Sequence, residues 1–276
     1  MPSDTLKIAA AQIDITLGEV DRNLQRMTEV LREAAWQGAG LTIFPECAVS
    51  GYCFESLEEA RPYSQAVPGP AIEQMAEACR ELDAVAVFGM LESEGEKLYN
   101  ACVAVGPNGL AGTYRKVHLP HLGIDRFTTP GERFGVCQAA GLNLGMSICY
   151  DGAFPEAARV MALAGADLIV LPTNWPPGAQ CTASYVSNAR ALENNVYYAA
   201  VNRVGDERGF HFIGGSRICD PSGETLAAAD HDAEEILYAE IDPAKARRKH
   251  LVRVPGKHEI DRFADRRPQT YRAIVE

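Results

Sequence analysis

Short apolar runs alternate with segments of helical periodicity along this chain, and their order predicts layered α/β structure. Leu24, Met27 and Leu31 recur at the three- and four-residue spacing of an amphipathic helix, which we place over 22–36. The same criteria predict strands over 6–13, 41–44 and 84–90 and a further helix over 71–82. The first third of the chain therefore alternates strand and helix.

A turn sequence, Gly106-Pro107-Asn108-Gly109, separates two further apolar runs and predicts a hairpin whose second arm covers 110–115. Pro221-Ser222-Gly223 predicts a second hairpin later in the chain. Between the hairpins we expect strands over 142–148, 167–171 and 196–201, and helices over 156–163 and 183–194. The repeated order of elements indicates two similar halves that face each other. We interpret residues 1–276 as a single domain in which two mixed sheets pack together and helices cover their outer faces.

Charge narrows the classes of partner that the protein can bind. The chain carries 26 basic and 37 acidic side chains, a net charge of −11, which argues against nucleic acid or an anionic membrane as partner. The basic cluster at 245–249 is interpreted as a solvated helix end. The N-terminus lacks the apolar stretch of a secretory signal, no apolar run approaches the roughly 20 residues of a membrane span, and no Cys-x-x-Cys pair occurs among the eight cysteines. These features favour a cytoplasmic enzyme with reduced thiols.

Three chemically capable side chains follow predicted strands, where side chains leave the core for a cleft. They are Glu46, Lys116 and Cys149. A thiol, a base to take its proton and a cation for the developing oxyanion are what acyl transfer to sulfur needs, and the lysine would also favour the thiolate. Each residue alone also has an ordinary structural reading: a buried core thiol, a helix-capping acid or a surface cation. The residues themselves leave both readings open.

The three residues lie in the motifs Phe44-Pro45-Glu46, Tyr114-Arg115-Lys116-Val117-His118-Leu119 and Gly145-Met146-Ser147-Ile148-Cys149-Tyr150-Asp151, and Leu171-Pro172-Thr173-Asn174-Trp175-Pro176 and Asn202-Arg203-Val204-Gly205 are among the later motifs. These motifs resemble those of the nitrilase superfamily of carbon–nitrogen hydrolases, and similar motifs extend over essentially the whole chain.

This resemblance implies a four-layer α-β-β-α sandwich that pairs across its helices into a homodimer or a larger even assembly. It also implies that Glu46 moves protons, Cys149 forms a thioester with the substrate, and Lys116 holds the oxyanion together with the backbone N–H of Tyr150. No metal or organic cofactor is implied. Tyr52 and Trp175 are candidate walls of the substrate pocket, although packing of the indole under the sheet edge is an equal alternative for Trp175.

One departure from the family pattern concerns a second glutamate that many members carry in the loop after the lysine. Here Asp125 is the nearest carboxylate, one residue off in spacing, and Glu132 follows the Pro130-Gly131 turn. We expect Asp125 to act as the second acid of the site, with Glu132 in reserve. A surface pair of Asp125 with a neighbouring arginine is the alternative.

Two further groups of residues have less bearing on the predicted reaction. His118 and His121 could be imagined as zinc ligands with Cys149, but H-x-x-H is common by chance and the helical H-E-x-x-H is absent. Arg190 and Glu193 stand three apart on a predicted helix and are expected to form a structural ion pair.

The function predicted first is hydrolysis of a small amide, either an aliphatic or ω-amide or an N-carbamoyl amine, with release of ammonia. The alternatives are a true nitrilase, a non-catalytic scaffold and a thiol-redox protein, of which the last is disfavoured by the lack of Cys-x-x-Cys.

Overall fold

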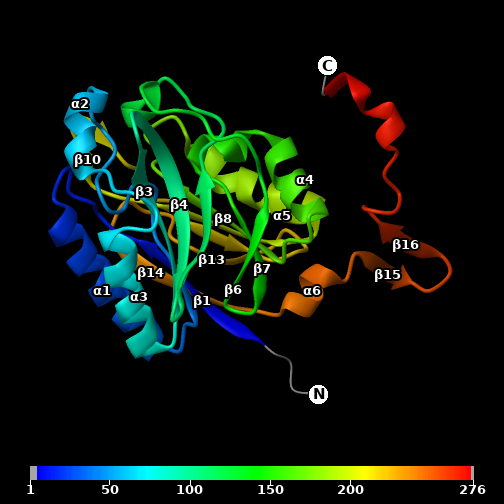
Figure 1. The fold of residues 1–276 in the computed structure, drawn as a ribbon. Coiled ribbons are helices and arrows are strands. Elements are labelled where there is room, and N and C mark those ends of the chain that lie inside the picture. Colours follow the sequence, from blue (N-terminus) through cyan, green and yellow to red (C-terminus); the bar gives the residue numbers. More distant parts are fainter. Residues whose placement is uncertain (1–4, 275–276) are drawn as a thin grey trace.

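The computed structural model describes residues 5–274 as two six-stranded mixed sheets packed face to face (Figure 1). The first sheet has the order β14 (Glu235–Ile241), β1 (Leu6–Gln12), β2 (Leu41–Ile43), β3 (Val85–Glu94), β4 (Lys97–Gly106), β5 (Gly109–Arg115). The second has the order β13 (Thr225–Ala228), β12 (Arg217–Cys219), β9 (Tyr197–Asn202), β8 (Leu168–Thr173), β7 (Leu142–Met146), β6 (Val136–Ala139).

The two sheets repeat one succession of strand pairings. From β5 to β14, neighbouring strands pair antiparallel, antiparallel, parallel, parallel and antiparallel. From β13 to β6 the order is the same. The hairpins β4–β5 and β12–β13 therefore occupy equivalent places, and the expectation of two similar halves is confirmed.

Helices cover the outer faces of both sheets, as predicted. Helices α1 (Val20–Trp36) and α3 (Pro70–Leu82) lie against the first sheet, and α4 (Pro155–Leu163) and α5 (Ser187–Asn194) lie against the second (Figure 1). Leu24, Met27 and Leu31 of α1 are buried, so the periodic apolar face is the one that contacts the sheet. The layers thus follow the order α-β-β-α. Where we expected one helix over 183–194, a π-helical turn at Thr182–Val186 precedes α5.

The apolar core lies between the two sheets, and the candidate active site lies at one edge of the sheets. Ile43 of β2 and Val170 of β8 belong to the same buried apolar cluster, although they come from different sheets. Burial of each such side chain contributes roughly 1.5–3 kcal/mol. Because β1, β2 and β3 run parallel and β5 runs in the direction of β3, the carboxyl ends of β2 and β5 lie at one edge of the first sheet.

Several elements lie outside the predicted set. Strand β14 pairs with β1 from the other end of the chain. The pairs β10 (Asp206–Glu207) with β11 (Phe210–His211) and β15 (His250–Val254) with β16 (His258–Asp261), and the short helices α2 (Leu57–Ala60) and α6 (Pro243–Arg247), were also not expected. The segment after α6 projects from the body of the molecule (Figure 1).

The interpretation of the basic cluster as a solvated helix end holds for Arg247, which lies in the last turn of α6 with its side chain 56% exposed, although it also binds the buried Asp167 at 2.8 Å. It is wrong for Lys249, which lies beyond α6 and whose Nζ lies 2.7 Å from the carbonyl oxygen of Asn195. Partial burial lowers the pKa of Lys249 to about 8. Across the described part of the chain, no helix is both long enough and apolar enough to traverse a membrane. That residues 1–276 form a single domain stays a prediction.

Candidate active site

Glu46 is fixed by the turn that follows β2. The backbone N–H of Phe44 donates to Val87 (2.8 Å), and the N–H of Gly89 donates to Pro45 (3.1 Å), so the turn continues to pair with β3 after β2 ends. A Cβ at Gly89 would lie 2.3 Å from the backbone nitrogen of Cys47, which explains why the strand has glycine there. The Glu46 side chain is thereby held in the interior, where it is 1% exposed.

Lys116 follows β5, and its side chain enters the same buried interior as the side chain of Glu46. Its backbone N–H donates to Asn100 (2.8 Å), and its carbonyl accepts from Gly131 (2.7 Å), so both sides of the residue are held. Its fully buried Nζ lies 2.7 Å from Oε1 of Glu46 and 2.5 Å from Oδ2 of Asp125. The structure therefore brings Glu46, Lys116 and Asp125 together in one buried cluster.

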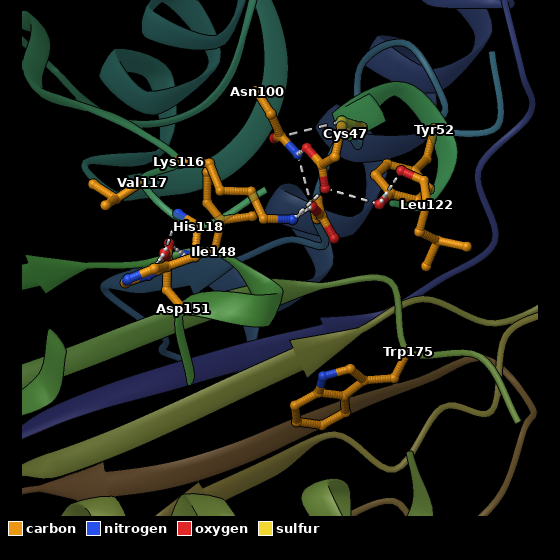
Figure 2. Close-up of polar contacts among 12 residues, drawn as sticks. Cys47, Tyr52, Asn100, Lys116, Val117, His118, Leu122, Ile148, Asp151 and Trp175 are labelled. Atoms are coloured by element: carbon orange, nitrogen blue, oxygen red, sulfur yellow. Dashed lines mark hydrogen bonds and ion pairs between the residues drawn. The ribbon is translucent and has the colours of Figure 1, made fainter. Parts of the chain in front are cut away.

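Asp125 lies in a short 3-10 turn, Gly123–Arg126, and its carboxylate is fully engaged. Oδ2 accepts from Lys116 and from the hydroxyl of Tyr52 (2.8 Å), and Oδ1 accepts from Asn100 (2.9 Å). The surface alternative for Asp125, a pair with a neighbouring arginine, does not match this placement. The Tyr52 hydroxyl, whose single proton goes to the nearer Asp125, also lies 3.0 Å from the carbonyl oxygen of Leu122, beside which Figure 2 shows it. This side chain therefore helps to hold Asp125 in place.

Asn100 is the residue of this cluster that reasoning from the sequence missed. It lies in the middle of β4, and its Nδ2 donates to Oε1 of Glu46 (2.7 Å) and to Asp125. Figure 2 shows its side chain directed toward the end of Lys116. The available signal was a single amide inside the apolar run of a buried strand, because a buried polar group needs partners.

Cys149 follows β7 from the second sheet and opens a 3-10 turn, Cys149–Ala153. Its φ of +45° lies in the left-handed region, which costs a non-glycine residue on the order of 1–2 kcal/mol. The residue is 7% exposed. Its thiol lies close enough to Glu46 and Lys116 that both side chains affect its pKa. The candidate nucleophile thus lies at a strained turn that faces the cluster from the opposite sheet.

The electrostatics of the cluster keep the lysine charged and the thiol neutral. Burial alone would lower the pKa of Lys116, but Asp125 and Glu46 outweigh it and raise that pKa well above its ordinary value. Burial, and then the Asp125 carboxylate, raise the pKa of Glu46 against the opposing effect of Lys116.

Burial and the Glu46 carboxylate raise the pKa of Cys149 to about 12, although Lys116, the side chain of Thr173 and the backbone N–H of Asn174 act in the opposite direction. Lys116 thus favours the thiolate, as expected, but burial and Glu46 outweigh it and the thiol of the free protein keeps its proton.

The remaining candidates lie around this centre. Tyr150, next to Cys149 in the chain, is 43% exposed, whereas Trp175 is only 4% exposed. Trp175 follows β8, and its backbone N–H donates to the side chain of Asn202 (2.8 Å). Figure 2 shows the Trp175 indole well apart from Lys116. That these residues and Tyr52 contact the substrate stays a prediction.

Glu132 and the histidines lie elsewhere. Glu132 is exposed and lines a groove of about 1000 Å³ between β5 and β6, away from the triad. His118 binds Asp151 at 2.8 Å, and His121 is exposed. Within residues 5–274, no three His, Cys, Asp or Glu side chains gather as metal ligands would. Arg190 and Glu193 form the expected ion pair, at 3.1 Å.

Comparisons with known proteins identify the family of this chain. The family model described as carbon-nitrogen hydrolase matches residues 7–250. A nitrilase of Pyrococcus abyssi is 38% identical, over 96% of this chain and 99% of the relative. The omega-amidase of Homo sapiens is 31% identical, over 87% of this chain and 90% of the relative.

Solved structures share the fold. The carbon-nitrogen hydrolase from Helicobacter pylori G27 superposes with a TM-score of 0.85 at 24% identity, over 99% of this chain and 98% of that one. The amidase from Nesterenkonia sp. AN1, as a double mutant in complex with acrylamide, gives 0.82 at 24% identity over the same shares. With its fold and nearly its whole length matched, this chain belongs to the carbon–nitrogen hydrolases of the nitrilase superfamily.

Proposed function

We infer that the protein hydrolyses the C–N bond of a small carboxamide or N-carbamoyl compound and releases ammonia, with Cys149 as nucleophile. Glu46 serves as the proton carrier and Lys116 as the cation that stabilises the oxyanion. The observation that carries the preference for an amide is a set of buried side-chain atoms, without a partner among residues 5–274, in two residues that influence the thiol.

Oε1 of Glu46 is bonded to Lys116 and Asn100, but Oε2 is buried and has no partner among residues 5–274. Asn174, whose backbone N–H faces the thiol, is fully buried, and neither Nδ2 nor Oδ1 has a partner in the same part of the chain. Buried polar atoms are normally hydrogen-bonded, so a ligand is expected to complete them. Oε2 and Oδ1 are acceptors and need N–H donors, which the –NH₂ group of an amide supplies and a nitrile lacks.

The reaction follows from these positions. Oε2 of Glu46 takes the proton of Cys149 as the sulfur attacks the substrate carbonyl. The ammonium of Lys116 has three N–H groups, two of which go to Glu46 and Asp125, so one is left for the oxyanion, alongside the backbone N–H of Tyr150. Glu46 then passes the proton to the leaving nitrogen, ammonia departs and a thioester remains. Water, deprotonated by Glu46, releases the acid and restores the thiol.

Asp125 has a different role from Glu46 in this scheme, because both of its oxygens are already bonded. It offsets the burial of Lys116 and keeps that side chain charged. In this scheme Glu46 transfers protons, and Asp125 keeps Lys116 charged.

The limited exposure of the site favours a small substrate. Glu46, Lys116 and Asp125 are at most 2% exposed, and only Cys149, at 7%, remains open to solvent. A protein of the same fold supports access for a group of this size: a structure of a mutant of the Nesterenkonia sp. AN1 amidase carries the acetamide moiety of fluoroacetamide on its active-site cysteine.

A nitrilase is the second candidate, supported by the name of the Pyrococcus abyssi relative. Ammonia release from matched pairs that share an acyl group, such as propionamide and propionitrile, separates the two. Short ω-amides and N-carbamoyl amines complete the panel, and Cys149→Ala is the blank. We expect the amide of each pair to show the higher kcat/KM. A higher value for the nitrile would overturn the preference, and no release from any compound would favour the scaffold alternative.

A further inference from the structure

We propose that Asp151 is a positioning residue that sets the separation between Lys116 and Cys149. Asp151 lies two residues after the nucleophile and is fully buried. Its Oδ1 accepts from the backbone N–H of His118 (3.0 Å) and from the ring Nδ1 of His118 (2.8 Å). Its Oδ2 accepts from the hydroxyl of Tyr114 (2.6 Å) and from the backbone N–H of Ile148 (3.0 Å). All four donors belong to residues that flank the two catalytic positions.

The arrangement joins two segments that come from different sheets. Tyr114 and His118 stand two residues before and two residues after Lys116, at the end of β5. Ile148 immediately precedes Cys149, after β7. Figure 2 shows Asp151 next to His118 and Ile148, with Lys116 extending away from them toward Asn100. One carboxylate thus holds the Tyr114 side chain before the lysine, the His118 backbone after it, and the backbone in front of the thiol.

The surroundings keep this link rigid. The His118 ring stacks on Phe154, with 3.7 Å between ring centroids and 10° between planes. Because the carboxylate accepts at Oδ1, His118 presents Nδ1–H to it. Burial and then Asp151 raise the pKa of Tyr114, so its hydroxyl keeps its proton and remains a donor. None of the hydrogen bonds of Asp151 goes to Glu46, Lys116 or Asp125 side chains, so its effect on the reaction passes through geometry.

The inference rests on the proposed roles of Lys116 and Cys149, and its test separates attack on a carbonyl from simple alkylation. Attack on an amide builds an oxyanion that Lys116 must meet, whereas alkylation of the thiol by iodoacetamide displaces iodide and builds none. In Asp151→Asn one acceptor oxygen becomes an NH₂ that faces N–H or O–H donors. We expect kcat to fall about tenfold to a hundredfold, the usual effect of a misplacement of about 1 Å, with KM changed less than about threefold. The alkylation rate of Cys149 should change by less than about threefold.

Two variants keep the test decisive. Tyr114→Phe removes one donor with little change of shape, and we expect a smaller fall in kcat, less than additive with Asp151→Asn because both act on one link. Asp167→Asn is the matched control, because Asp167 is also buried and accepts from Asn143 (2.9 Å) and Arg247. Asp167 lies just before the start of β8, whereas Thr173, which acts on the thiol, lies at the other end of that strand. This control should lose stability and keep its kcat per folded molecule.

Unchanged kcat in folded Asp151→Asn and in Tyr114→Phe, beside an active wild type, would overturn the positioning role. Equal loss of alkylation and turnover would overturn it as well, since that result means general damage to the site. A wild type without turnover on the whole panel would instead overturn the proposed function and this inference with it.

Discussion

Nζ of Lys116 and Oδ2 of Asp125 lie 2.5 Å apart in an ion pair that is completely removed from solvent. A buried ammonium left with a single carboxylate partner carries a large desolvation cost. We therefore expect Asp125→Asn to reduce kcat by about a hundredfold or more, the typical size of a lost electrostatic contribution at an active site. Steady-state kinetics on the best substrate of the panel measure this.

Glu132→Gln is the matched control for that variant, because Glu132 is an exposed carboxylate of the same loop, away from the cluster. Its activity should stay near that of the wild type. A crippled Glu132→Gln together with an active Asp125→Asn would show that the second acid has been assigned to the wrong residue.

Cys149→Ala should abolish turnover and leave the fold and the assembly intact. The substitution removes the attacking sulfur, and no other step can form the thioester. Intact-mass measurement of the wild type with substrate should reveal an acyl adduct. Cys181→Ala, which changes an exposed cysteine, serves as control and should turn over normally. Persistent turnover in Cys149→Ala would exclude this residue as nucleophile.

The acid limb of the pH profile should belong to Glu46. This residue works as a base only when ionised, and its pKa is raised above 4.5, so kcat/KM should fall as pH drops through a value above 4.5. The contribution of Glu46 to folding stability depends on pH in the opposite direction. A raised pKa means that the contribution of Glu46 to folding is fully present below its unfolded value and is lost as pH rises through the folded one. An acid limb at or below pH 4.5 would contradict the assignment.

Activity should survive exhaustive chelation with EDTA, since the thiol and its base supply the whole reaction. The nearest histidine, His118, is bonded to Asp151 and stacked on Phe154. Turnover before and after dialysis against EDTA is the measurement, with added zinc as a second arm. Loss of activity that zinc restores would revive the metal site.

A homodimer or a larger even assembly is expected through the outer helices of the second sheet. Val160 and Leu163 on α4 are each 45% exposed, Leu192 on α5 is 42% exposed, and Tyr185 of the preceding turn is 70% exposed. Light scattering at micromolar concentration should report twice the 29.9 kDa chain or an even multiple of it. Val160→Asp with Leu163→Asp should shift the assembly toward monomer. A monomeric wild type would refute this expectation.

The sequence predicted the elements whose pattern is local. Apolar periodicity located α1 and β7, and turn residues located the β4–β5 hairpin. Strand β14 could not be placed in that way, because its pairing with β1 joins residues more than 200 positions apart. Strand ends and family motifs predicted the triad of Glu46, Lys116 and Cys149.

Asn100 was not predicted, because an amide in a strand gives no indication of which carboxylates it will contact in the folded protein. The protonation of Cys149 also depends on depth of burial, a property of the assembled fold. The sequence thus singled out Glu46, Lys116 and Cys149 as candidates, and their roles stay predictions. The protonation state of Cys149 depends on three-dimensional packing.

The protonated state of Cys149 also bears on how the protein withstands oxidants. Peroxide attacks thiolates, and its selectivity follows thiolate character and exposure. With a pKa near 12 and 7% exposure, this sulfur presents almost no thiolate to solvent between turnovers. Hydrogen peroxide should consume the nucleophile slowly, and activity should persist under oxidative stress that silences cysteine enzymes with pre-ionised thiols.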